Sequence, residues 1–455
     1  MKHFNEYKQL NLAEVSKEIL EQWEKEDLFH KSIETREGNP SFLFFEGPPS
    51  ANGMPGIHHV MARTIKDTFC RFKTMQGYQV KRKAGWDTHG LPVELGVEKL
   101  LGITKEDIGK KISVDEYNAA CRREVMKYTQ EWTNLTKQMG YWVDLENPYI
   151  TYDNKFIETL WWLLKQLYQK GYLYKGYTIQ PYSPAAGTGL SSHELNQPGC
   201  YRDVKDTTAV AQFTVLSTDA CQAASLLPKE NLYILAWTTT PWTLPSNTAL
   251  CVGPKIDYVA VKGQNPYTQQ EAIYIVAENL VTSHFKAEEG KELEILWKGK
   301  GSELVGIKYQ QLMPWVKPCA IEGGKPVVKE AEAFRVIPGD YVTTEDGTGI
   351  VHIAPTFGAD DAKVAKDAGI PSLFIVDKAG DTRPMVDFTG KYFLKEDMNE
   401  EFIEKCVNDS YWKHSGDFVK NAYSPKYNIN GKYDEKAASK EMDLNVILCV
   451  EMKEE

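Results

Sequence analysis

The sequence lacks closely spaced cysteine pairs, long apolar runs and an excess of positive charge. Its eight cysteines are scattered without a C-x-x-C pair, which indicates reduced thiols in a cytosolic protein and neither a disulfide framework nor a zinc site. The sequence has no run of about 20 apolar residues, so no membrane span is predicted. The N-terminus, "MKHFNEYKQLNLAEV", lacks the apolar core of a signal peptide. The net charge of −10 gives no global basic field for nucleic acid, although a local run such as "VKRKAG" (80–85) can attract a polyanion.

The 455 residues suffice for two or three domains, and residues 1–195 have an α/β pattern. Short apolar strands are predicted at 42–45 and 79–84, and a helix is predicted from Asp153 to near Gly171. This alternation predicts a parallel sheet with helical crossovers. A helix at 57–76 carries one apolar stripe, made of Ile57, Val60, Met61, Ile65, Phe69 and Phe72.

Beyond residue 195 the pattern changes to strands. Runs such as "NLYILAWTTT", "AIYIVAE" and "GIVHIAP", separated by turn residues, predict a compact β-barrel or sandwich over 196–400. Residues 401–455 are polar and aromatic and are predicted to be irregular, with a final strand in "DLNVILCVEMKEE".

One stretch, "GPPSANGMPGIHHVMARTIKD" (47–67), joins a predicted strand to a predicted helix through a turn rich in glycine and proline. Free N–H groups and the helix dipole make such a turn a phosphate site. His58 and His59 add side-chain donors that could stabilise charge developing on a phosphate during transfer. The alternative is a pair of partly buried histidines that cap a helix.

These residues resemble the first signature, His-Ile-Gly-His, of the class I aminoacyl-tRNA synthetases. "GWDTHGLPVE" (85–94) and residues 137–176 are similar to blocks of the isoleucyl branch, and "AWTTTPWTLPSNTAL" (236–250) and "DGTGIVHIAPTFGADD" (346–361) resemble the two signatures of its editing insertion. The resemblance covers nearly the whole chain. It implies the first half of a split Rossmann-like nucleotide-binding domain (1–195), a β-barrel-like editing domain inserted into it (196–400) and an irregular distal part of the insertion (401–455).

The chain departs from the family pattern in two places. The first signature is permuted, because glycine stands at Gly56 and histidine at His58, which moves one imidazole by two positions, roughly 200° around a helix. The second signature, Lys-Met-Ser-Lys-Ser, is missing, and "KAASK" (436–440) is interpreted as a surface helix or turn. The chain is therefore interpreted as a fragment without the second half of the nucleotide-binding domain or the anticodon-binding region.

The resemblance also implies site residues. For ATP these are Gly56, His58 and His59, with both histidines catalytic, and for the amino acid Gly47, Pro48, Pro49 and Asp87, the last pairing with the amino group. In the insertion, Asp361 would hold the substrate ammonium and His352 would lie near the ester or the terminal ribose, both as catalytic residues. The editing pocket would be lined by Thr238, Thr239, Thr240 and Asn247 together with His352 and Asp361.

The implied activity is ATP-dependent activation of isoleucine, its transfer to tRNA(Ile), and hydrolysis of mischarged valyl-tRNA(Ile). ATP would enter with Mg²⁺ as substrate, and no protein-bound metal is expected, since the start of the insertion, "QPYSPAAGTGLSSHEL" (180–195), has no cysteine. We expect a cytoplasmic monomer that binds tRNA(Ile), isoleucine and ATP and no membrane. The alternatives are a stand-alone aminoacyl-tRNA editing hydrolase and a non-catalytic tRNA-binding module.

Overall fold

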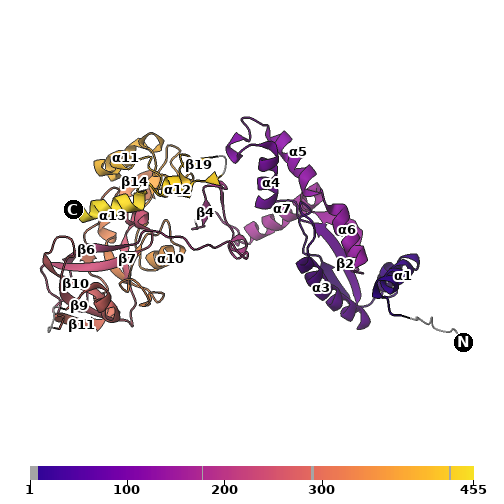
Figure 1. Ribbon diagram of the computed structural model, residues 1–455, viewed down its shortest axis with the longest axis horizontal. Helices are drawn as coiled ribbons and strands as arrows, with labels where there is room; N and C mark the ends of the chain where they lie inside the picture. Colours follow the sequence, from indigo (N-terminus) through magenta and orange to yellow (C-terminus); the bar gives the residue numbers. More distant parts are fainter. Residues whose placement is uncertain (1–8, 177, 288–291, 430–431, 455) are drawn as a thin grey trace. The chain divides into compact units, whose positions relative to one another are not determined.

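The computed structural model describes residues 9–176, 178–287, 292–429 and 432–454 (Figure 1). The chain forms two compact units, Met1–Gly176 and Tyr177–Glu455. This division precedes the expected boundary after residue 195, and that boundary and the one after residue 400 stay predictions about domains.

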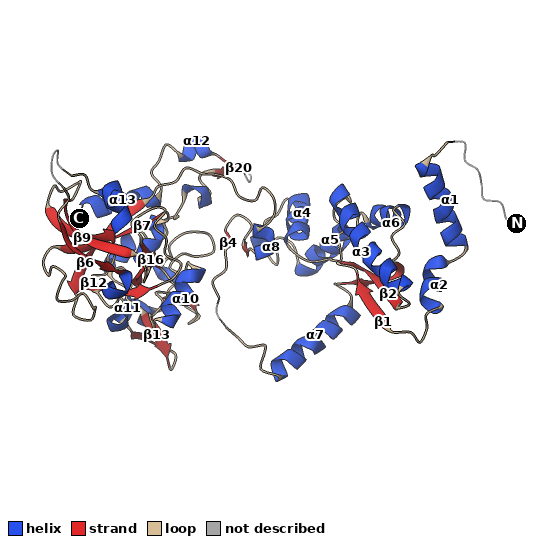
Figure 2. Ribbon diagram, turned by 90° about the horizontal axis from the view of Figure 1, so that it is seen from below, coloured by secondary structure: helices blue, strands red, loops and turns tan. Residues whose placement is uncertain are grey.

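The first unit contains a three-stranded parallel sheet in the order β1-β2-β3, as predicted for an α/β fold (Figure 2). Ser41 of β1 pairs with Gln79 of β2, and Phe45 pairs with Lys83. The predicted strands and helices are confirmed, including the helix that begins after Asp153. The elements are α1 (Leu12–Lys25), α2 (Leu28–Glu34), β1 (Ser41–Phe45), α3 (Ile57–Met75), β2 (Gln79–Trp86), α4 (Leu91–Leu101), α5 (Val114–Val125), α6 (Thr129–Gln138), β3 (Asp144–Ile150) and α7 (Asn154–Gln169).

Helix α3 packs in the unit through its polar face. Arg63, Cys70 and Thr74 are its buried residues, and the Arg63 guanidinium donates to Thr136 Oγ1 over 2.5 Å. The apolar stripe faces outward instead, with Met61 and Phe69 each 65% exposed. The apolar stripe of a helix normally packs against a neighbouring element. In α3 the stripe is exposed, so it is a surface that the first unit leaves uncovered.

The second unit is built around a closed ring of six strands, which confirms the predicted barrel. Strand order around the ring is β7-β16-β8-β15-β12-β6, and pairing of β6 with β7 closes it; β10, β9 and β11 extend the sheet from β7. The strands are β6 (Ala209–Ser217), β7 (Leu232–Thr238), β8 (Ala249–Val252), β9 (Asp257–Gln264), β10 (Glu271–Ala277), β11 (Ile295–Lys300), β12 (Lys308–Tyr309), β15 (Arg335–Pro338) and β16 (Ile350–Ile353).

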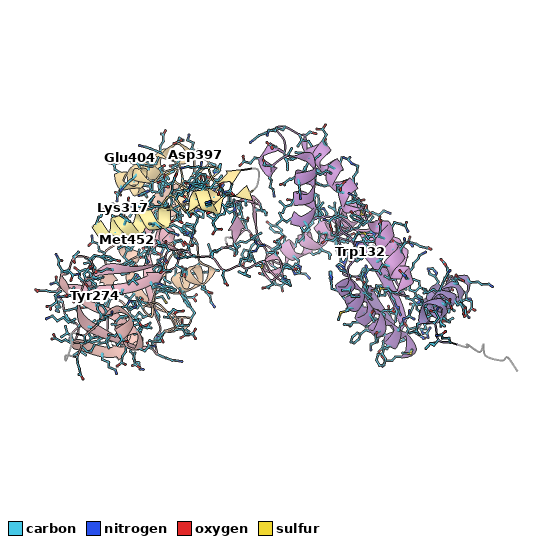
Figure 3. All side chains as sticks on the ribbon, in the orientation of Figure 1. Trp132, Tyr274, Lys317, Asp397, Glu404 and Met452 are labelled. Carbon is cyan, nitrogen blue, oxygen red and sulfur yellow. The ribbon has the colours of Figure 1, made fainter. Side chains whose placement is uncertain are left out.

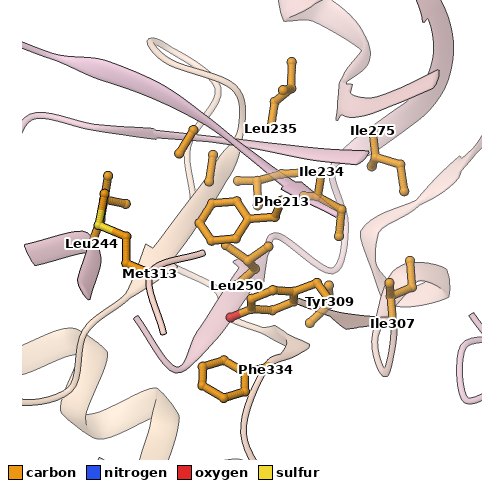
Figure 4. Close-up of a cluster of buried hydrophobic side chains, with 14 of the residues drawn as sticks. Phe213, Ile234, Leu235, Leu244, Leu250, Ile275, Ile307, Tyr309, Met313 and Phe334 are labelled. Carbon is orange, nitrogen blue, oxygen red and sulfur yellow. The ribbon is translucent and has the colours of Figure 1, made fainter. Parts of the chain in front are cut away.

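Large apolar side chains fill this ring. Phe213, Ile234, Leu250 and Tyr309 are almost fully buried and lie together in one cluster (Figure 4). The rings of Phe213 and Tyr309 meet edge to face with centroids 5.3 Å apart, a favoured arrangement of aromatic pairs. The second unit therefore has a continuous core of its own.

Short elements surround the barrel, and the chain ends in a helix. The expectation of a strand in the last residues is wrong: Asp443 caps α13 (Leu444–Glu454) by accepting from the Val446 N–H over 3.2 Å, and Leu444 and Leu448 share one buried face. The other elements are β4 (Tyr182–Ser183), β5 (Thr188–Gly189), α8 (Ser192–Leu195), α9 (Val281–His284), β13 (Cys319–Glu322), β14 (Lys325–Val328), α10 (Ala359–Asp367), β17 (Ile375–Val376), β18 (Thr382–Arg383), α11 (Glu400–Cys406), β19 (Asn428–Ile429), β20 (Lys432–Tyr433) and α12 (Glu435–Ala438).

Candidate functional site

The turn between β1 and α3 brings the two histidines to the start of a helix. Gly56 is the extended N-cap, and its N–H donates to Nδ1 of His59 over 2.9 Å. The His59 ring also lies 4.6 Å from the ring of Trp132, which is labelled in Figure 3. Burial, followed by the neighbouring His58, lowers the pKa of His59. His59 is thus held by the protein, whereas His58 is exposed.

Gly56 gives the imidazole of His58 its place. A Cβ at position 56 would lie 2.9 Å from Cε1 of His58 and 3.0 Å from its Nδ1, so any larger residue there would push the ring away. The ring folds back toward the residue where the family signature has its first histidine. Counting rotation along the helix therefore overstates the displacement that the permuted signature causes, because the side chain reaches back over the first turn.

The expected amino-acid residues lie at the carboxyl ends of neighbouring parallel strands. The Asp87 N–H, after β2, donates to the Pro49 carbonyl oxygen, after β1, over 3.0 Å. Gly47 and Pro48 belong to the same turn as Pro49. In open α/β sheets, this edge is where ligands bind.

Sequence reasoning missed Glu46, which anchors this turn. Its carboxylate is 3% exposed and accepts hydrogen bonds from Lys66 Nζ, over 2.6 Å, and from the Tyr141 hydroxyl. Its carbonyl oxygen accepts from the Tyr149 hydroxyl over 2.5 Å. An acidic residue at the end of the apolar run "SFLFF" was the available signal, because a buried carboxylate needs partners.

The second unit contains a cavity of about 900 Å³ beside the barrel. It is lined by residues of separate sequence motifs: Thr240 and Thr243 follow β7, His352 lies in β16, and Asp361 lies in the first turn of α10. Residues 178–182, Pro184 and the rings of Trp242 and Phe357 also line it, and none of these was predicted. Trp242 and Thr243 belong to the quoted motif "AWTTTPWTLPSNTAL", which was the signal for them.

His352 is a buried, neutral imidazole at the wall of this cavity. Its Nε2 lies 3.2 Å from the hydroxyl oxygens of both Thr238 and Thr243, and its Nδ1 has no hydrogen-bond partner among the described residues. Burial lowers the pKa of His352 to about 4, because desolvation disfavours the imidazolium. At neutral pH it can exchange hydrogen bonds with hydroxyl groups but carries no charge.

Asp361 is half-buried, and its carboxylate faces the cavity from α10. Its Oδ2 accepts from the Ala354 N–H over 3.0 Å, and burial raises the pKa of this carboxyl. A Cβ at Gly358 would lie 2.6 Å from Asp361 Cγ, so glycine is needed for the close approach of the carboxylate. The neighbouring Asp360 is exposed and does not line the cavity.

Three other expected pocket residues do not line the cavity. Thr238 lies behind the wall, where its Oγ1 accepts from the Thr240 N–H over 3.0 Å, and Thr239 is exposed. Asn247 is 1% exposed: its amide donates to the Ala249 carbonyl over 2.8 Å and accepts from the Tyr309 hydroxyl over 2.7 Å. Its polar atoms are used inside the core and organise the turn that carries the cavity residues.

Among the described residues, no group of three or more histidine, cysteine, aspartate or glutamate side chains is arranged to hold a metal ion. None of the helices in this part of the chain has the length and apolar character needed to cross a bilayer.

The family model for tRNA synthetases class I (I, L, M and V) matches residues 18–412, so the chain belongs to this family. Proteins named isoleucine–tRNA ligase are similar over 99% of this chain: the one from Bacteroides thetaiotaomicron is 63% identical and the one from Porphyromonas gingivalis 57%. The chain spans only 40% and 39% of their lengths. A solved LeuRS–tRNA–LeuAMS complex from Agrobacterium radiobacter is similar at 16% identity over 79% of this chain and 43% of that one, with a TM-score of only 0.33.

Proposed function

We propose that this chain is the N-terminal part of an isoleucine–tRNA ligase and that its second unit hydrolyses valyl-tRNA(Ile). One observation carries the proposal: a neutral histidine, a carboxylate and two threonine hydroxyls, from motifs about 100 residues apart, converge on one cavity. The names of relatives that are 57–63% identical support the choice of isoleucine. The cavity is large enough for an aminoacyl group together with its ribose.

Asp361 would hold the substrate by its charge. The α-ammonium nitrogen of an aminoacyl ester lies only two bonds from the carbonyl carbon, so a fixed ammonium group also restricts the position of the ester carbonyl. Burial raises the pKa of the Asp361 carboxyl. A bound ammonium would favour the ionised carboxylate again, which makes the pairing selective for a cationic amine over a neutral group.

The remaining polar groups would orient water. In the hydrolysis, a water oxygen bonds to the ester carbonyl carbon, the bond to the ribose oxygen breaks, and that oxygen takes up the proton released by the water. Thr243 and His352 form a hydrogen-bonded pair next to the cavity, and Thr240 Oγ1 lies 3.2 Å from Thr243 Oγ1. These neutral groups can hold a water molecule and a ribose hydroxyl without requiring a metal ion.

A separate hydrolytic pocket fits the problem of telling isoleucine from valine. One methylene group in an apolar pocket contributes only about 1–3 kcal/mol to the discrimination between two amino acids. The discrimination of isoleucine from valine by isoleucyl enzymes is the standard example of this limit. A cavity that admits the smaller valyl group and excludes the larger isoleucyl group removes the error afterwards. Thr240, half-buried at the cavity wall, is the residue that we expect to set this size limit.

The first unit would contribute one half of the synthetic site. Gly56, His58 and His59 would bind ATP, which arrives with Mg²⁺ as substrate, and Gly47, Pro48, Pro49 and Asp87 would bind isoleucine. The bond between Asp87 and Pro49 supports this grouping, because it places both segments at one sheet edge. We further propose tRNA(Ile) as the partner, a monomeric state and a cytoplasmic location, in line with eight unpaired cysteines.

The test is deacylation of valyl-tRNA(Ile) and isoleucyl-tRNA(Ile) by the 455-residue chain. We expect valyl-tRNA to be hydrolysed and isoleucyl-tRNA to be spared, and Asp361→Ala to lower the rate on valyl-tRNA by about a hundredfold or more, since the ester is no longer positioned. Asp360→Ala is the matched control and should stay near the wild-type rate. If the chain hydrolyses neither substrate, or if Asp361→Ala is as active as wild type, the hydrolytic assignment is wrong.

A further inference from the structure

The peptide backbone of Trp242 is held from both sides by buried side chains that are distant in sequence. Its N–H donates to Asn445 Oδ1 over 3.0 Å, and its carbonyl oxygen accepts from the Tyr392 hydroxyl over 2.6 Å. Asn445 is 0% exposed and Tyr392 is 1% exposed. Because neither side chain reaches solvent, water cannot easily replace either bond.

The residue held in this way, Trp242, lies in the cavity wall. The Trp242 ring meets the ring of Phe357 edge to face, with centroids 4.9 Å apart, and both rings line the cavity. The next residue, Thr243, lies 3.2 Å from His352 Nε2. A shift of the Trp242 backbone would therefore move both an aromatic wall and a hydroxyl that contacts His352.

The two holding residues come from parts of the chain outside the quoted editing motifs. Asn445 is in the first turn of α13, and α13 packs on the 3₁₀ turn Pro241–Ser246. Tyr392 lies in the segment between β18 and α11, where its ring meets that of Trp315 edge to face at 5.6 Å. The segment predicted to be irregular, 401–455, thus supplies one of the two contacts.

We propose that Asn445 and Tyr392 are positioning residues of the hydrolytic cavity, which fix Trp242 and through it Thr243. The inference rests on the proposed function and extends it: specificity for the smaller aminoacyl group depends on the Trp242 wall, and turnover depends on the Thr243 hydroxyl. Neither Asn445 nor Tyr392 lines the cavity, so neither is placed to touch the substrate. Each would act through its hydrogen bond to the Trp242 backbone.

The experiment compares Tyr392→Phe and Asn445→Ala with a matched control in the full 455-residue chain. Tyr392→Phe removes one hydroxyl without changing the packing of the ring. The control is Tyr258→Phe, because Tyr258 is equally buried and its hydroxyl also donates to a backbone carbonyl, that of Gly349, over 2.6 Å, away from the cavity lining. Thermal unfolding of each variant shows that it is folded, and kcat, KM and the valyl-to-isoleucyl rate ratio are then measured.

We expect Tyr392→Phe and Asn445→Ala each to lower kcat on valyl-tRNA about tenfold, with KM changed less than about threefold, because small displacements at a reacting centre affect the transition state most. The valyl-to-isoleucyl ratio should fall as well. The double variant should lose less than the product of the two single effects, since both hydrogen bonds hold the backbone of one residue, Trp242.

Three results would overturn the proposal: wild-type kcat and selectivity in folded Tyr392→Phe, an equal loss in Tyr258→Phe, or multiplicative effects in the double variant. Absence of hydrolysis in the wild-type chain would instead refute the proposed function. The two failures are therefore distinguishable.

Discussion

The two units of this chain bury their apolar residues to different extents. In the second unit, a ring of strands closes on itself around a continuous cluster that includes fully buried Phe213 and Tyr309. In the first unit, buried clusters are small, such as Ala51, Trp86 and Trp132, while Phe69 of α3 is 65% exposed. The six strands of the ring leave no edge among themselves, whereas the three-stranded parallel sheet has β1 at an open edge and depends on further covering elements.

Separating the units tests this difference most strongly. We expect residues 177–455 alone to unfold in one cooperative urea transition, and residues 1–176 alone to self-associate and bind a dye for apolar surfaces, such as ANS. Circular dichroism, size-exclusion chromatography and ANS fluorescence measure this. A monomeric, ANS-silent first unit would refute the comparison, as would a second unit without a cooperative transition.

A pair of phenylalanine substitutions sharpens the contrast. Phe213→Ala should lower the free energy of unfolding of the second unit by about 3–5 kcal/mol, because it leaves a cavity in the barrel. Phe69→Ala, on the exposed stripe of α3, should change that of the first unit by no more than about 0.5 kcal/mol. Urea titration of the whole chain, followed by far-UV circular dichroism, gives both values. Similar losses in the two variants would show that α3 is packed.

Buried histidines extend the comparison to pH. An imidazole with a folded-state pKa of about 4 stays neutral while the unfolded chain, with a pKa near 6.5, takes up a proton, so His352 lowers stability as pH falls from about 6.5 to 4. Relative to His352→Gln, wild type should lose about 3 kcal/mol over this range. The half-buried His59 of the first unit, whose pKa is also lowered, should act in the same direction with a smaller loss. Equal pH profiles for wild type and His352→Gln would contradict the burial of His352.

The smallest effect concerns the permuted signature of the first unit. Gly56→Ala should displace the His58 ring, seen as a shift of its imidazole NMR signals, and should lower the free energy of unfolding by up to about 1 kcal/mol, because alanine is a poor N-cap. Gly53→Ala is the control, since a Cβ there meets nothing within 4 Å. Unchanged His58 signals in Gly56→Ala would show that the ring does not lie against residue 56.

Local patterns were sufficient for much of the fold. Strand β1, helix α3 and the helix after Asp153 follow from periodicity and from residue preferences at turns and helix starts, which act over a few residues. The final helix was missed because "LNVILCV" is an apolar run without a clear period, and the Asp443 cap was the signal that distinguishes helix from strand. The orientation of α3 was also hidden, because Arg63 and Thr74 are polar residues that become buried through partners elsewhere in the chain.

The candidate site was predictable where motifs carry it and hidden where the tertiary structure does. His352, Asp361 and Thr240 line one cavity, whereas Asn247 turns its amide into the core, because the Tyr309 hydroxyl and the Ala249 carbonyl are placed there by distant strands. The contacts of Trp242 with Tyr392 and Asn445 span 150 and 203 residues. No local pattern encodes such pairs, so they require the structure.

The open edge of β1 also has a consequence in time. Strand β1 and its neighbours are complete after residue 150, yet the roughly 280 residues of the second unit must still be translated, which takes some tens of seconds at usual rates of synthesis. Throughout that interval, the nascent chain outside the ribosome presents an unpaired parallel edge beside the apolar stripe of α3. An open strand edge and an exposed apolar stripe favour contacts with other chains, so the first unit is the part of the nascent protein most prone to aggregate during synthesis.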